Sequence, residues 1–300
     1  MNTANFEYTE LQIRAKSIIT YPQFTYSISK KSKDILNMKK NILEHKQLAY
    51  SNILSESAKK RMSRAIDILC QCAIKKRIYN NVSKKYVTHR LSFITLTISS
   101  KSNITLKDGY ELGLKRFLNI LRKRKLITNY IWKAEIQQRG QLHYHITTTA
   151  FIDYQIIRDI WNNIQLSNGW LDDYYNSKGH YNANSTDIHA VKHVNDLSAY
   201  LIKEFVKSHQ NNFSDNGKKW DCSHNLRGKK YFTVAETTEN VLLIGKYKAD
   251  NKIVEIKEDR YSIIKLNSID RTALLTLTQL QNYRAFQNSI AKQISKEYTS

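Results

Sequence analysis

The chain has 300 residues, of which 41% are hydrophobic, so it is long and apolar enough to fold around a core and is not an intrinsically disordered chain. No apolar run approaches the roughly 18 residues of a membrane-spanning helix, and the first ten residues lack the basic-then-apolar pattern of a signal peptide. The formal net charge of +22 favours a polyanionic partner, nucleic acid first and an anionic membrane second.

The three cysteines, Cys70, Cys72 and Cys222, are too few and too irregularly placed to predict a disulfide framework. They fit a reducing compartment, and a cytoplasmic location is expected. Cys222 and His224 alternate in a short stretch, but two residues do not make a zinc site, so no structural zinc is expected.

Residues 1–85 are predicted to form a basic, mainly helical region. Apolar residues recur at spacings of three and four between about 33 and 77, which is the helical period. The cations at 75–77 suit the C-terminal end of a helix dipole. Two interpretations stay open for this region: a solvated helical hairpin packed on the main domain, or an appendage that grips DNA.

Residues 86–230 are predicted to form an α+β domain. Strands rich in β-branched and aromatic residues are expected at 86–100, 129–137, 142–151 and 186–191. Helices are expected at 107–125, 153–165 and 194–208, and a polar loop at 167–186. This alternation, with an antiparallel hairpin in the middle, is typical of helices packed on an antiparallel sheet. Residues 231–300 are expected to add a β/α extension that ends in a helix.

The central hairpin carries two histidines. Because side chains alternate along a strand, His143 and His145 share one face, and Glu135 and Gln137 share a face of the preceding strand. A three-residue loop at 139–141, whose glycine can adopt the left-handed conformation, would pair Glu135 with His145 and Gln137 with His143. Two imidazoles and a carboxylate are donors suited to a divalent metal. A structural role for the histidines stays open.

The helix expected at 194–208 is amphipathic and carries a tyrosine beside its apolar face. On a helical wheel, Tyr200 lies on a polar stripe with Lys203 one turn further on. Half-buried tyrosines are common on amphipathic helices, so the pattern alone assigns Tyr200 no role.

The segments FITLTISS, Glu135 with GQLHYHI, and AYLIKEFVKS, in that order, resemble the HUH endonucleases that initiate rolling-circle replication in small phages and plasmids. The stretch KWDCSHNLRG at 219–228 also looks like a tail segment of such replication proteins. The resemblance covers roughly residues 90–230. It implies metal-dependent nicking and rejoining of single-stranded DNA through a 5′-phosphotyrosine intermediate.

Carried over residue by residue, the resemblance implies a site with the following parts. His143 and His145 would hold Mg²⁺ or Mn²⁺, with Glu135 as the third ligand. Tyr200 would be the nucleophile, and Lys203 would steady the scissile phosphate or the charge developing on it.

The sequence departs from the pattern of many such initiators at one position. They carry a second tyrosine four residues after the first, and here that position is Glu204. A one-tyrosine enzyme is therefore expected, which puts in doubt any termination step in which two tyrosines alternate.

Two alternative functions stay open: a one-tyrosine transposase of the HUH class, and a nucleic-acid-binding protein without catalysis. The expected partners are single-stranded DNA and the origin duplex, with no membrane. A host polymerase and helicase are also expected, since the sequence has no helicase P-loop. The expected setting is a bacterial cytoplasm, with a phage or plasmid as the source. Stacking on single-stranded DNA is an open role for four residues of the 167–186 loop: Tyr174, Tyr175, Lys178 and Tyr181.

Overall fold

The computed structural model describes residues 5–25, 56–73, 76–80, 84–100, 104–137, 140–191 and 217–296. By its internal contacts the chain forms two units, one of residues 1–58 and 230–289 and the other of residues 59–229 and 290–300. Each unit combines helices with a five-stranded antiparallel sheet, so the predicted α+β class is confirmed. The domain boundaries predicted near residues 85 and 230 stay predictions.

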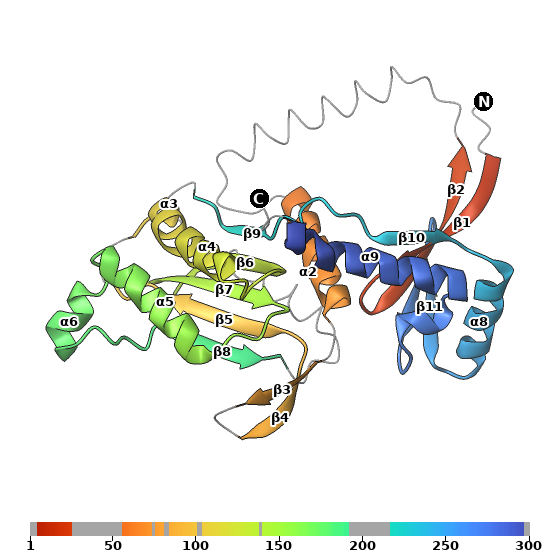
Figure 1. The fold of residues 1–300 in the computed structure, drawn as a ribbon. Coiled ribbons are helices and arrows are strands. Elements are labelled where there is room, and N and C mark those ends of the chain that lie inside the picture. Colours follow the sequence, from red (N-terminus) through yellow and green to blue (C-terminus); the bar gives the residue numbers. More distant parts are fainter. Residues whose placement is uncertain are drawn as a thin grey trace, which may run out of the picture. The chain divides into compact units, whose positions relative to one another are not determined.

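The second unit is built on an antiparallel sheet, here called the main sheet, with strand order β8-β5-β7-β6-β9 (Figure 1). Its strands are β5 (Ser92–Thr97), β6 (Tyr130–Ile136), β7 (Leu142–Thr148), β8 (Thr186–Ala190) and β9 (Trp220–Cys222). Figure 1 shows α4 and α5 over one face of the sheet. The helices that follow β5 and β7 are α3 (Leu106–Asp108), the π-helix η1 (Gly109–Leu114), α4 (Lys115–Lys123), α5 (Tyr154–Ser167) and α6 (Asp172–Lys178).

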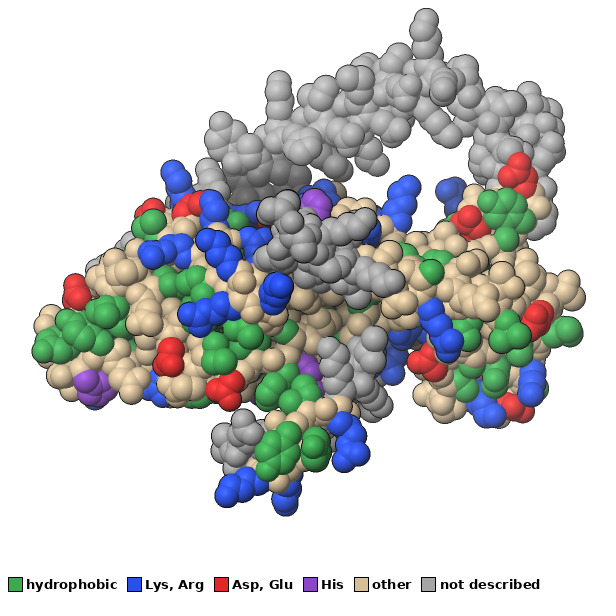
Figure 2. Space-filling view, viewed as in Figure 1, with side chains coloured by type: hydrophobic (Ala, Val, Ile, Leu, Met, Phe, Trp, Pro, Cys, Tyr) green, Lys and Arg blue, Asp and Glu red, His purple; other side chains and the backbone are tan. Residues whose placement is uncertain are grey.

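A helix and a two-stranded ribbon precede the main sheet. Helix α2 (Glu56–Cys72) is followed by β3 (Lys76–Asn80) and β4 (Lys85–His89), which pair with each other and project below the main sheet in Figures 1 and 2. The single strand predicted at 86–100 is therefore wrong, because its two halves belong to different sheets. At the break between them, the Arg90 guanidinium donates hydrogen bonds to carbonyl oxygens at the end of α2.

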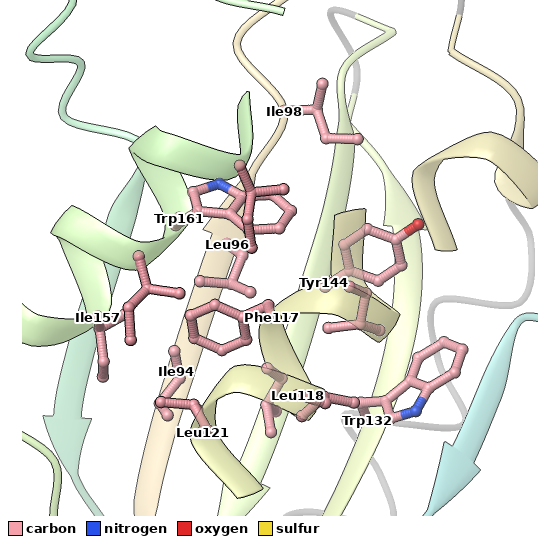
Figure 3. Close-up of a cluster of buried hydrophobic side chains, with 14 of the residues drawn as sticks. Ile94, Leu96, Ile98, Phe117, Leu118, Leu121, Trp132, Tyr144, Ile157 and Trp161 are labelled. Atoms are coloured by element: carbon pink, nitrogen blue, oxygen red, sulfur yellow. The ribbon is translucent and has the colours of Figure 1, made fainter. Parts of the chain in front are cut away.

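The core of the second unit lies between the main sheet and the helices on it (Figure 3). Alternate residues of β5, β6 and β7 point into it, while α4 and α5 contribute apolar stripes. Trp161 of α5 packs edge-on against Phe117 of α4, with ring centroids 5.9 Å apart, and its indole N–H donates to the Thr97 carbonyl at 2.8 Å. Truncating such a buried aromatic side chain to alanine typically costs about 3–5 kcal/mol. This packing leaves the opposite side-chain set of each strand for the other face.

The first unit has its own antiparallel sheet, with strand order β10-β1-β2-β12-β11. Its elements are β1 (Asn5–Ile13), β2 (Ser17–Thr25), β10 (Phe232–Ala235), α8 (Thr238–Ala249), β11 (Ile253–Lys257), β12 (Ser262–Leu266), the 3-10 helix η3 (Arg271–Leu274) and α9 (Leu277–Lys296), whose last turns belong to the second unit. Buried Arg271 joins this core by donating to the Tyr283 hydroxyl at 2.7 Å and to the Ala15 carbonyl at 3.1 Å.

The prediction of a mainly helical N-terminal region is wrong for residues 5–25, which form β1 and β2. Their apolar residues alternate: Leu11 and Ile13 are buried while Gln12 between them is not, as in a half-buried strand. The prediction holds for α2, where Met62 and Ile66 are buried at helical spacing. The cations expected to end that helix fall after it, since it stops at Cys72 and β3 starts at Lys76. The rest of the predicted helical pattern, at 33–55, lies outside the described residues.

Candidate active site

The two histidines lie on the face of the main sheet opposite to α4 and α5. Strands β6 and β7 pair so that Glu135 faces His143 and Lys133 faces His145. The predicted register, with Glu135 opposite His145, is therefore wrong by two residues. Because the side-chain period of a strand is two, this shift leaves the predicted residues on their common face.

The turn explains the change of register. The Gln137 N–H donates to the Gln141 carbonyl at 2.9 Å, which makes 138–140 the three-residue loop instead of 139–141. Gly140 has a φ of +81° and is the last residue of this loop. A type I turn followed by one left-handed residue is the usual three-residue hairpin, and it puts the glycine third, not second.

Glu135 binds the more distant of the two histidines. Its Oε2 lies 3.1 Å from Nε2 of His145 and 3.5 Å from Nζ of Lys133, which is 3% exposed. The hydrogen bond from His145 lowers the pKa of Glu135 to about 2, and the charge of Lys133 adds to this, although burial opposes it. The carboxylate is therefore ionised across the physiological pH range.

His143 is held by one ring nitrogen and has the other free of protein partners among the described residues. Its Nδ1 lies 3.1 Å from the Gln137 amide nitrogen and 3.5 Å from the Thr97 hydroxyl. Its Nε2 is buried, and no hydrogen-bond partner for it exists in the described part of the chain. Burial lowers the pKa of His143 to about 4, and the nearby His145 lowers it further. The ring is therefore neutral at pH 7.

Strand β5 holds the other edge of both rings. The Thr95 hydroxyl lies 3.2 Å from Nδ1 of His145, as Thr97 does from Nδ1 of His143 at a longer distance. The Phe93 ring stacks on His145 with centroids 5.4 Å apart. Sequence reasoning noted the Thr/Ser alternation of this strand but gave the threonines no role. The signal was available, since residues at the same period on adjacent strands meet.

The geometry does not by itself form a metal site. No three His, Cys, Asp or Glu side chains among the described residues gather closely enough to hold a metal ion. The Glu135–His145 hydrogen bond occupies two of the three predicted donors, so a metal bound by all three requires this bond to open. The buried, unpartnered Nε2 of His143 nevertheless fits a ligand nitrogen, because metal-binding histidines are commonly held through their other ring nitrogen.

The predicted nucleophile Tyr200 and its neighbour Lys203 lie outside the described residues, as does Glu204. The described strands before and after them are β8 and β9, and these form the two opposite edges of the main sheet.

The aromatic residues predicted to lie in a loop at 167–186 fall partly on a short helix, α6. The rings of Tyr175 and Tyr181 stack with centroids 4.4 Å apart, and both side chains are exposed. Tyr174 packs edge-on against His180. The exposed pair keeps its predicted role in stacking on single-stranded DNA as a prediction.

Comparison with known proteins defines the class. Residues 91–209 match the family model of the phage-type replication-associated protein ORF2, a segment of less than half the chain that runs from β5 past β8. This segment is therefore that of a replication-associated, or Rep, protein, and the predicted family is confirmed. No curated protein and no solved structure gives a significant match to the chain. Among the described residues, no helix has the length and hydropathy needed to span a membrane.

Proposed function

We propose that the protein is a rolling-circle replication initiator of the HUH type, which nicks and rejoins single-stranded DNA through a 5′-phosphotyrosine. The observation that carries the proposal is the pair of imidazoles, His143 and His145, on one face of the main sheet, inside the segment that matches the Rep family. The family supports a role in DNA replication. The residues on this face suggest the chemistry.

His143, His145 and Glu135 would hold a divalent ion, Mg²⁺ or Mn²⁺. Neutral His143 offers the lone pair of its buried Nε2, and ionised Glu135 offers an oxygen donor. Gln137 and Thr97 hold the far side of the His143 ring, and Thr95 holds that of His145. When bound, such an ion acts as a Lewis acid that polarises the scissile phosphate.

Tyr200 would be the nucleophile. A phenol with a pKa near 10 is a weak nucleophile at neutral pH, so it needs a phosphate made more electrophilic by neighbouring charge. Its oxygen forms a bond to phosphorus as the bond to the 3′ oxygen breaks; the phenol proton is lost and the leaving oxygen becomes a 3′-OH. Lys203 would stabilise the charge on the phosphate oxygens. Rejoining is the reverse of these steps.

The topology of the main sheet is compatible with this assignment. Tyr200 belongs to the connection between β8 and β9, the two edge strands, and the packed core with α4 and α5 occupies one face between those edges. In the proposal the connection brings Tyr200 to the other face, where the histidines lie.

The product defines the expected partners. A 3′-OH at the nick is a primer for a host polymerase, and a host helicase would separate the strands, since the sequence contains no P-loop. With Glu204 at the second tyrosine position, termination would need water, a second subunit or another tyrosine.

A covalent-adduct assay tests the proposal. The full chain is incubated with end-labelled single strands of its own replicon and Mn²⁺, denatured, and examined for labelled protein, and the adduct is mapped by mass spectrometry. We expect a phosphotyrosine at Tyr200 that is absent with a chelator and in Tyr200→Phe, while Tyr175→Phe, at an exposed tyrosine, behaves as wild type. Binding of these strands without any adduct would contradict the proposal and favour a binding protein without catalysis.

A further inference from the structure

The ribbon of β3 and β4 has a composition unlike the rest of the second unit. Residues 76–90 include five cations and no acidic residue: Lys76, Arg77, Lys84, Lys85 and Arg90. Figure 2 shows lysine or arginine and hydrophobic side chains together on this projection. Arg77, Lys84 and Lys85 are exposed, so this surface has a positive potential that nothing on the ribbon itself offsets.

One face of the ribbon is exposed and carries groups that form hydrogen bonds. The pairing puts Arg77 opposite Thr88 and Tyr79 opposite Tyr86, and directly opposed residues share a face. Tyr79 is 47% exposed and Tyr86 is 65% exposed, and such a large exposed aromatic surface commonly marks an interaction site.

The side chains on this face are already arranged by contacts with one another. The rings of Tyr79 and Tyr86 pack edge to face with centroids 5.3 Å apart, and the Arg77 guanidinium lies over the Tyr86 ring at 5.2 Å. Their polar tips therefore reach outward from a supported cluster, which lowers the entropy lost on binding.

The base of the ribbon is fixed to the main sheet. His89, the last residue of β4, is buried, its Nε2 lies 2.8 Å from the hydroxyl of Ser92 at the start of β5, and its ring packs edge-on against Phe151. Arg90 ties the same junction to the end of α2. The ribbon is thus held at one end of the strand that carries Thr95 and Thr97.

We infer that the β3–β4 ribbon is a contact surface for duplex DNA beside the cleavage site. A two-stranded ribbon fits the major groove, where arginine and hydroxyl groups contact base edges, and lysines contact the phosphates. The engaged rings of Tyr79 and Tyr86 favour this over stacking on a single strand, which needs free ring faces. The inference rests on the proposed function, because it assigns the ribbon to the DNA that the enzyme nicks.

The test compares two ribbon variants of the full chain with a variant of equal charge. Lys84→Asn with Lys85→Gln removes two charges, and asparagine tolerates the positive φ of 50° at residue 84. Tyr79→Ala with Tyr86→Ala removes the aromatic face. Lys257→Gln with Lys265→Gln removes two exposed lysines from the first unit and serves as the control. Affinity is measured for the origin duplex and for a single-stranded origin oligonucleotide, over a range of salt concentrations.

We expect both ribbon variants to bind the duplex roughly tenfold more weakly at ~0.1 M salt, with the control near wild type. The lysine variant should also reduce the salt slope of log K for the duplex by about 2, because each of the two lysines would neutralise one phosphate. Melting temperature and cleavage of the single strand should stay at wild-type values, which shows that the variants are folded.

Duplex affinity and salt slope equal to those of the control would overturn the inference. So would a decrease confined to the single strand, which would make the ribbon a stacking platform. Cleavage is read separately: a wild-type chain that never forms an adduct, combined with weaker duplex binding in the ribbon variants, would refute the proposed function and leave the ribbon assignment intact.

Discussion

Glu135 Oε2 lies 3.1 Å from Nε2 of His145, although the register puts Glu135 directly opposite His143. The carboxylate thus reaches diagonally across the hairpin and leaves Nε2 of His143 without a partner among the described residues. The two histidines consequently differ: one is paired with a carboxylate, and the other is buried and neutral.

Changing both His143 and His145 to alanine should abolish metal-dependent nicking and leave most DNA binding, because phosphate contacts elsewhere dominate affinity. Nicking and electrophoretic mobility shift are measured on the same single-stranded oligonucleotide. His189→Ala is the control, since His189 is exposed and also packs on Phe93. Undiminished nicking by the double variant would refute the metal assignment.

Glu135→Gln should weaken metal binding about 10–100-fold, the usual range for an altered metal-site residue, and excess Mn²⁺ should restore part of the nicking rate. Glutamine keeps the size of the side chain but cannot supply the charge. The apparent Mn²⁺ affinity is measured from the concentration dependence of nicking. If the lower rate does not respond to Mn²⁺ at all, Glu135 positions His145 and is no ligand.

Lys203→Ala should slow cleavage more than it weakens DNA binding, since the proposed role of this lysine is at the charge that develops on the phosphate. Single-turnover cleavage rates and equilibrium affinities are compared with those of Lys178→Ala in α6. Equal losses of rate and affinity would make Lys203 a simple contact to the DNA backbone.

Removing residues 1–25 should unfold the first unit. Strand β1 pairs with β10 and β2 pairs with β12, so their loss splits the sheet and removes buried Leu11, Ile13 and Ile18 from its core. Proteolysis within 230–289 should become fast, whereas removal of residues 1–4 alone should have no such effect. A truncated chain as resistant as the full one would show that these strands are dispensable.

Cys222 should make unfolding easier at alkaline pH. Burial raises the pKa of its thiol to about 12, and the nearby Asp221 adds to this. The unfolded chain releases the thiol proton near pH 9 while the folded chain keeps it, so the stability falls between pH 9 and 12 by up to about 1.4 kcal/mol per pH unit. Denaturant unfolding of wild type and Cys222→Ala should differ in this slope. Parallel curves would contradict it.

The sequence by itself determined which side chains share a face. Alternation along a strand is local, so His143, His145 and Glu135 could be assigned to one side of a hairpin without knowledge of its register, and the apolar stripes of α4 and α5 to the other. The Tyr200 helix was read in the same way, and its place stays a prediction.

Only the tertiary structure decided how distant segments pair. The register followed from the position of Gly140 in its loop, and the Glu135–His145 contact from that register. Residues 5–25 form strands because β10 and β12 are there to pair with them, more than 200 residues away. Such pairing depends on long-range hydrogen bonds and burial, and no local periodicity reports it.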